Sequence, residues 1–106
     1  IFRREKTLDR VRRLAYILRR ELDRLRRLPH VGDVRQVGLI AGIELAGVPD
    51  RMGYRVCLEA RRRGVLLRPL GNVIPLMPPY VISERDLIRL VRVVGEAIRA
   101  VIPEKT

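Results

Sequence analysis

The sequence opens with the pattern of one long amphipathic helix. Apolar residues recur every three or four positions, at Leu8, Val11, Leu14, Ala15, Leu18, Leu22, Leu25 and Leu28. Thr7 suits the N-cap of this helix, and Pro29 would end it because the residue before a proline is kept out of the α region. A helix with one apolar face must bury that face against another element, so the chain is expected to form a packed domain.

Two strands and a second helix are expected next. The stretch from Val31 to Leu45 is rich in β-branched residues and is interrupted by Gly38, which predicts two strands that meet at this glycine. A shorter apolar helix pattern then runs over residues 51–63. Gly64 follows it directly, and glycine is the usual residue just past a helix C-terminus.

A hairpin is expected after Gly64. The apolar run 65–68 is too short for a helix, a Pro-Leu-Gly-Asn turn follows it, and residues 73–77 return as its partner. Pro75 lies within the second strand and has no amide proton to donate. That strand should therefore be irregular or lie at the edge of a sheet.

A final helix completes the expected fold. Ser83 with Asp86 three residues later predicts a capping-box start, and an apolar stripe continues from there to Val101. The order of elements becomes α, β, β, α, β, β, α. It predicts an α+β fold, with residues 1–106 as a single domain in which three helices pack on a small, mainly antiparallel sheet.

The composition excludes several classes of protein. A single cysteine, Cys57, excludes an internal disulfide framework, and with a single histidine, His30, it leaves no Cys/His zinc site. Cys57 lies inside the apolar helix pattern and is interpreted as a small buried hydrophobe. His30 has no catalytic partner at a suggestive spacing. No apolar run approaches the length of a membrane-spanning helix, so we expect a soluble, cytoplasmic protein without a membrane partner.

The charge leaves one alternative open. The formal net charge is +11, and of the 23 basic residues only Lys6 and Lys105 are lysines. A strongly basic small domain is typical of nucleic-acid binding. However, acidic residues stand one helical turn from arginines, as in Asp9–Arg13, Glu21–Arg24 and Asp23–Arg27, and aromatic residues for base stacking are few. A free-standing nucleic-acid-binding module is therefore the less favoured alternative.

Two blocks of the sequence resemble a known family. Residues 31–45 read VGDVRQVGLIAGIEL, while residues 68–71 read RPLG and residues 76–79 read LMPP. Together they resemble the C-terminal small domain of class III pyridoxal-phosphate aminotransferases, and the resemblance extends over nearly the whole chain. The second block is most similar to family members that act in biotin biosynthesis and take the amino group from S-adenosylmethionine. The resemblance implies a fold type I C-terminal domain, belonging to a longer chain.

The resemblance also implies a substrate site. Arg68 matches the arginine that receives the substrate carboxylate, and Pro69 to Asn72 match the loop that places it, so Arg68, Pro69 and Gly71 are the expected substrate-binding residues. The planar guanidinium of arginine suits a carboxylate better than the point charge of lysine does. Pro75 stands where many glutamate-using family members carry an arginine. Glutamate is therefore the less favoured amino donor.

By the same resemblance, the catalytic machinery belongs to a large domain upstream. The Schiff-base lysine, the aspartate beside the pyridine nitrogen and the phosphate-binding residues of the family all lie there. Neither Lys6 nor Lys105 falls in a matching motif. We therefore expect no catalytic residue in this chain, no metal, and no pyridoxal phosphate bound by it alone. The expected partners are the large domain, a small-molecule substrate and a second copy of the full enzyme in a homodimer.

Overall fold

The computed structural model describes residues 2–102, with side chains from Lys6 onward; Lys105 lies outside the described residues. The helices are α1 (Phe2–Leu25), α2 (Met52–Arg62) and α3 (Glu84–Val101), and the strands are β1 (Val31–Val37), β2 (Ile40–Leu45) and β3 (Val73–Leu76). The α+β class, with three helices and an antiparallel sheet, is confirmed. Within residues 2–102, no helix is both long and apolar enough to cross a membrane.

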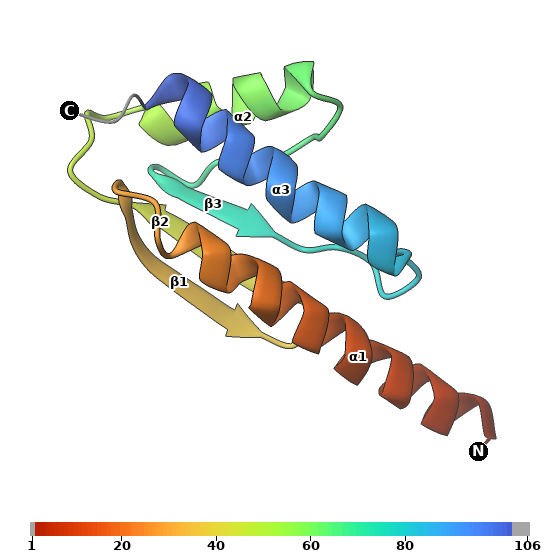
Figure 1. Ribbon diagram of the computed structural model, residues 1–106. Helices are drawn as coiled ribbons and strands as arrows, with labels where there is room; N and C mark the ends of the chain where they lie inside the picture. Colours follow the sequence, from red (N-terminus) through yellow and green to blue (C-terminus); the bar gives the residue numbers. More distant parts are fainter. Residues whose placement is uncertain (1, 103–106) are drawn as a thin grey trace.

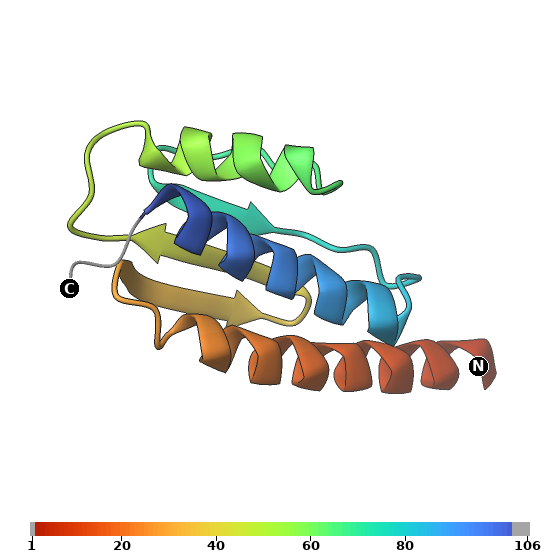
Figure 2. The same ribbon diagram turned by 45° about the horizontal axis from the view of Figure 1, so that its top comes forward.

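The helices form one layer and the strands form the other. The sheet has the order β1-β2-β3 with both pairs antiparallel, and the helices cover one of its faces, with α3 packed against both α1 and α2 (Figures 1 and 2). Side chains along β2 alternate accordingly. Ala41, Ile43 and Leu45 are buried beneath the helices, while Ile40 and Glu44 are exposed. The opposite face of the sheet is left uncovered.

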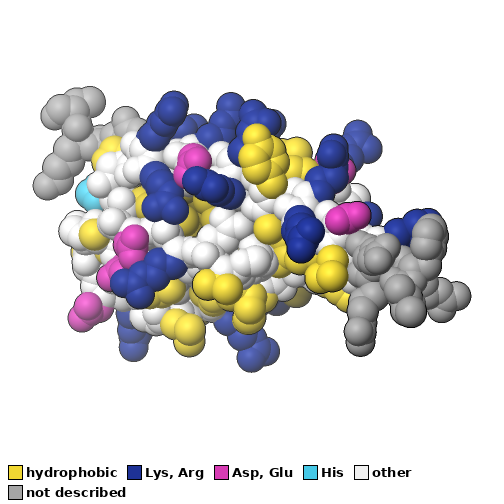
Figure 3. All heavy atoms as spheres, turned by 90° about the horizontal axis from the view of Figure 1, so that it is seen from below, with side chains coloured by type: hydrophobic (Ala, Val, Ile, Leu, Met, Phe, Trp, Pro, Cys, Tyr) yellow, Lys and Arg dark blue, Asp and Glu magenta, His cyan; other side chains and the backbone are white. Residues whose placement is uncertain are grey.

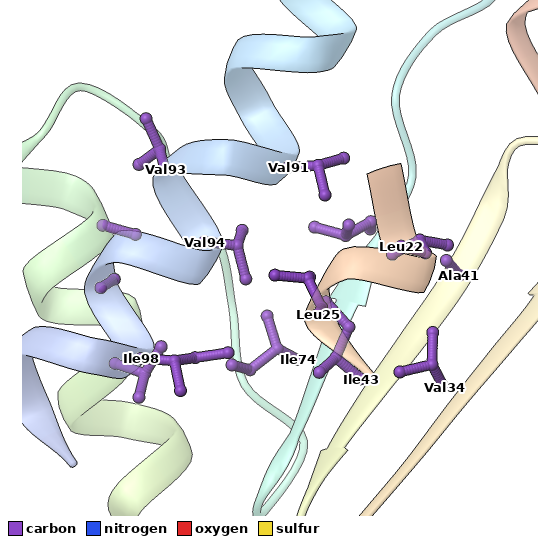
Figure 4. Close-up of a cluster of buried hydrophobic side chains, with 14 of the residues drawn as sticks. Leu22, Leu25, Val34, Ala41, Ile43, Ile74, Val91, Val93, Val94 and Ile98 are labelled. Atoms are coloured by element: carbon purple, nitrogen blue, oxygen red, sulfur yellow. The ribbon is translucent and has the colours of Figure 1, made fainter. Parts of the chain in front are cut away.

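The core lies between the two layers. Leu25 of α1, Ile43 of β2, Ile74 of β3 and Val94 of α3 point toward one another (Figure 4). No polar or charged residue with a described side chain is buried. Burial of this many apolar side chains from every element is the main source of stability for the domain.

The first helix differs from its expected bounds. Thr7 is not the N-cap, because α1 already begins at Phe2, and the helix ends at Leu25 rather than Leu28. The residues before Thr7 are mostly arginine, glutamate and lysine, which are good helix formers and let the helix extend. Leu8, expected on the buried stripe, is 50% exposed. The reason is that the first turns of α1 run past the end of the sheet (Figures 1 and 2).

The hairpin predicted from residues 65–68 and 73–77 is wrong. Residues 65–69 form no strand, and β3 instead pairs with β2, leaving a single bridge between Leu70 and Val73. Pairing with β2 places β3 at the edge of the sheet, where Pro75 was expected, opposite Gly42. Since Pro75 has no amide proton, a further regular strand cannot form on the free side of β3.

The local signals at turns and caps are confirmed. The β1–β2 turn contains Gly38 with φ +58°, and Gly64 follows α2 with φ +92°. Both values lie in the left-handed region that glycine adopts without strain. At the start of α3, the Ser83 hydroxyl oxygen accepts a hydrogen bond from the Asp86 amide at 3.1 Å, which is the N-cap half of the predicted capping box.

Candidate functional site

The predicted substrate-binding residues lie on the connection between α2 and β3, residues 63–72, called the substrate loop below. Its first part, residues 65–69, has no regular structure and follows the Gly64 turn. A tight turn then closes it, in which Leu70 and Val73 exchange two backbone hydrogen bonds of 2.9 Å each and Gly71 has φ +60°. The loop therefore ends in a compact turn directly attached to the edge strand.

Arg68 lies exposed on this loop. It makes no hydrogen bond or ion pair with any residue that the structure describes. It lines a hollow of about 490 Å³ together with Tyr54, Cys57, Leu58, Arg61, Leu66, Leu67 and Pro69. The hollow is mostly apolar, and a cation at the rim of an apolar hollow can bind the carboxylate of a ligand whose remainder is aliphatic.

A second hollow adjoins the first. It has a volume of about 540 Å³ and is lined by Asp50, Arg51, Tyr54, Pro69, Gly71 and Asn72. Tyr54 and Pro69 line both hollows. The structure thus brings the three predicted residues, Arg68, Pro69 and Gly71, to one surface beside α2. Sequence reasoning missed the part of that surface that α2 contributes, because no local pattern links residues so far apart along the chain.

Asn72 fastens the loop to the beginning of α2, and this role was also missed. Its side-chain oxygen accepts a hydrogen bond from the Gly53 amide at 2.9 Å, and its side-chain nitrogen donates to the Pro49 carbonyl at 3.2 Å. A Cβ atom at Gly53 would overlap the Gly71 carbonyl oxygen. Only glycine at position 53 therefore allows this close approach. The available sequence signal was the asparagine itself, since asparagine in turns commonly bonds to nearby backbone groups.

Ion pairs account for part of the basic charge on α1, with partners that differ from the expected ones. On the face that Figure 3 shows, basic side chains are scattered among exposed apolar ones. Among the described side chains, the ion pairs that involve α1 include Arg13–Glu84 at 2.6 Å, Arg92–Glu21 at 3.2 Å and Arg26–Asp23 at 3.3 Å. Two of these join α1 to α3 rather than staying within one helix. The spacing rule for single helices could not predict them, because the packing of α3 beside α1 offers closer partners.

Arg10 also has a structural role. Its guanidinium donates to the backbone carbonyls of Tyr80, Val81 and Ile82 at 2.9, 3.3 and 2.8 Å. These carbonyls precede α3, so Arg10 ties the segment after β3 to α1. A basic residue used in this way is not evidence for a nucleic-acid surface.

Cys57 and His30 show no sign of catalytic use. Cys57 is buried at 5% exposure, as expected, and burial raises the pKa of its thiol above the ordinary value. The His30 ring nitrogen Nδ1 lies 3.4 Å from the Ala46 carbonyl oxygen. Among the residues that the structure describes, no three His, Cys, Asp or Glu side chains gather into a metal site.

The residues around the two hollows do not fit pyridoxal phosphate. That cofactor needs a lysine amine for its covalent attachment, and neither hollow is lined by a lysine. Lys6, the lysine that the structure describes, lies on the exposed first turns of α1. We therefore assign no chemistry of pyridoxal phosphate to the described residues of this chain.

The fold and the site define a small α+β domain that presents an arginine on a loop. The chain belongs to the class III aminotransferase family, whose family model, "Aminotransferase class-III", matches residues 1–98.

Similar proteins of known name or structure support this family assignment. An adenosylmethionine-8-amino-7-oxononanoate aminotransferase of Nitratidesulfovibrio vulgaris is 47% identical over 95% of the chain and 20% of that protein. The crystal structure of the Methanocaldococcus jannaschii enzyme of the same name matches with a TM-score of 0.85 at 37% identity, over 94% of this chain and 25% of that one. A PMP-bound aminotransferase from Vibrio fluvialis, at 22% identity, matches in fold with a TM-score of 0.85, over 96% of this chain and 25% of that one. The chain thus spans about a fifth to a quarter of the length of these proteins.

Proposed function

We propose that this chain is the C-terminal substrate-recognition domain of a pyridoxal-phosphate-dependent aminotransferase of biotin biosynthesis. The parent enzyme would transfer an amino group from S-adenosylmethionine to 7-keto-8-aminopelargonic acid. The observation that carries the proposal is that Arg68 lines a mostly apolar hollow and has no ion-pair partner among the residues that the structure describes. The names of relatives that are up to 47% identical over almost the whole chain support the choice of reaction.

In this proposal the domain binds and orients the acceptor. The acceptor has a terminal carboxylate on an aliphatic chain, so Arg68 would receive the carboxylate in a two-pronged, charge-assisted contact. Apolar residues of the hollow, such as Leu66 and Leu67, would face the aliphatic part. The cofactor, with its lysine and its phosphate-binding residues, would be held by the large domain of the parent chain. The domain therefore contributes substrate recognition, and bond making belongs to the rest of the enzyme.

The uncovered face of the sheet is the surface that we assign to contact with the large domain. Val37 and Ile40 pair across the β1–β2 hairpin and are 79% and 59% exposed, and Met77, just after β3, is 71% exposed. Apolar side chains this exposed favour burial against another part of a protein. The full enzyme would be a homodimer in the cytoplasm, with nucleic acid not among its partners.

The experiment is a pair of assays on the parent enzyme and on this domain. The complete enzyme should form the diamino product with S-adenosylmethionine as donor, and should use glutamate far less well, in keeping with proline rather than arginine at position 75. The isolated 106-residue chain, mixed with pyridoxal phosphate and treated with borohydride, should give no saturable lysine adduct. Preference for glutamate in the first assay would contradict the proposed reaction. A saturable adduct at Lys6 or Lys105 in the second assay would contradict the proposal that the large domain holds the cofactor.

A further inference from the structure

The beginning of α2 lacks a cap from its own sequence. Its N-cap residue, Arg51, has φ +69° and makes no side-chain capping hydrogen bond. An N-cap side chain normally accepts a hydrogen bond from the second or third amide of the helix. Here the second amide, that of Gly53, donates to the side-chain oxygen of Asn72 at 2.9 Å. Asn72, which lies 19 residues after Gly53 in the sequence, therefore caps α2 in place of Arg51.

Asn72 also joins two other segments. Its side-chain nitrogen donates to the Pro49 carbonyl at 3.2 Å, and its own carbonyl accepts from the Leu45 amide at the end of β2 at 2.8 Å. One residue thus connects the sheet, the segment before α2 and the helix itself. The overlap that a Cβ atom at Gly53 would make with the Gly71 carbonyl shows how closely the loop is pressed against the helix.

The substrate loop is held at both ends of α2. At the C-terminal end of the helix, the Val65 amide donates to the Ala60 carbonyl at 2.9 Å. At the N-terminal end, Asn72 makes the contacts described above. Arg68 lies midway between these two anchors. The backbone that carries Arg68 is therefore fixed on both sides, by Val65 and by Asn72.

We propose that Asn72 is the positioning residue for Arg68, so that the cap it forms on α2 sets where the substrate carboxylate is bound. This inference rests on the proposed role of Arg68 as the carboxylate-binding residue. Asn72 need not touch the substrate. Displacement of a binding group by about 1 Å is enough to lower catalytic efficiency by roughly 10- to 100-fold.

The test is a double-mutant cycle in the complete parent enzyme, with the keto-amino acid acceptor as the varied substrate. Asn72→Ala should lower kcat/KM for the acceptor roughly 10- to 100-fold. In an Arg68→Ala background the same change should lower it by no more than about twofold, because the group that Asn72 positions is gone. Gln36→Ala is the matched control, since the Gln36 amide also joins two segments, through the Ala15 and Gly38 carbonyls at 2.8 and 2.9 Å, but lies away from both hollows. It should leave kcat/KM within about twofold of the parent.

Further variants separate positioning from folding. Asn72→Asp keeps an acceptor for the Gly53 amide, with a charge that is favourable at a helix N-terminus, but loses the donor to the Pro49 carbonyl, so it should recover only part of the efficiency that Asn72→Ala loses. If Asn72→Ala yields no folded enzyme, Asn72→Gln takes its place in the cycle, because the longer amide stays polar but displaces the cap. The expected and contradicting results are the same for both.

The outcomes distinguish this inference from the proposed function. If Arg68→Ala lowers efficiency but Asn72→Ala leaves it unchanged, the inference is wrong and the role of Arg68 stands. If the Asn72 effect appears in full in the Arg68→Ala background, Asn72 does not act through Arg68 and the inference is again overturned. If Arg68→Ala itself has no effect, the proposed function fails at its substrate site, whatever Asn72 does.

Discussion

Arg13 of α1 and Glu84 in the first turn of α3 are joined by two side-chain contacts. The Nε atom of Arg13 lies 2.6 Å from Oε2 of Glu84, and its Nη2 atom lies 3.2 Å from Oε1. The hydrogen bond and the charge of Arg13 hold the pKa of Glu84 below its ordinary value of 4.5. The pair links two helices that are far apart in the sequence, beside the point where α3 begins.

This pair makes the stability of the domain depend on pH. Because the pKa of Glu84 is lowered in the folded state, its contribution is present above the ordinary value and is lost as the pH falls through the lowered one. Glu84→Gln should therefore reduce the free energy of unfolding slightly at neutral pH and leave it unchanged once the carboxyl is protonated in both states. Urea denaturation of parent and variant at several pH values measures this. A difference that stays constant down to strongly acidic pH would show that charge is not its cause.

Gly95 of α3 lies against Leu25 of α1 and permits the two helices to pack closely. A Cβ atom at position 95 would come within 2.8 Å of Cδ2 of Leu25, which is buried. The end of the Leu25 side chain must shift to make room, so Gly95→Ala should stabilise the domain by less than the roughly 1 kcal/mol that alanine gains over glycine inside a helix. In a Leu25→Ala background, where that side chain is gone, the same change should give the full gain of roughly 1 kcal/mol. Urea denaturation of the four proteins measures the difference, and an equal gain in both backgrounds would contradict the account.

Cys57 should be nearly inert as a thiol in the folded domain. It is buried, and burial raises the pKa of its thiol, so little reactive thiolate is present at neutral pH. A chromogenic disulfide reagent should modify the folded chain far more slowly than the chain in denaturant. The rate should follow the unfolded fraction as denaturant is added. Equal rates in the folded and unfolded chains would show that the thiol is accessible.

Local chemistry explains which parts of the fold could be predicted from the sequence. The Ser83 cap, the Gly38 turn and the Gly64 helix end each depend on residues within a few positions, and all three are confirmed. The hairpin at 65–68 was wrong because the choice of strand partner is not local. β2 offered β3 a free edge, and no pattern within residues 65–77 reveals that edge.

The residues of the candidate site were predictable to a similar extent. The resemblance pointed to Arg68, Pro69 and Gly71, whose role in binding stays a prediction, and these residues line two adjoining hollows. The contributions of Tyr54 and Gly53 could not be predicted, because they depend on how α2 packs against a loop about 20 residues away. Such contacts become visible only when the fold is known.

The most direct test of the account is the steady-state kinetics of Arg68→Ala in the complete enzyme. Arg68→Ala removes a charge-assisted contact made by two parallel donors, so it should lower kcat/KM for the keto-amino acid roughly 30- to 1000-fold. Arg68→Lys should recover only part of this loss, because lysine keeps the positive charge but lacks the planar, two-donor geometry of the guanidinium. Arg62→Ala and Arg99→Ala are the controls, since both residues are exposed helix positions outside the two hollows around Arg68. The account predicts a large loss for Arg68→Ala and little change for the controls. An Arg68→Ala enzyme within about twofold of the parent and no different from the controls would contradict the carboxylate-binding role.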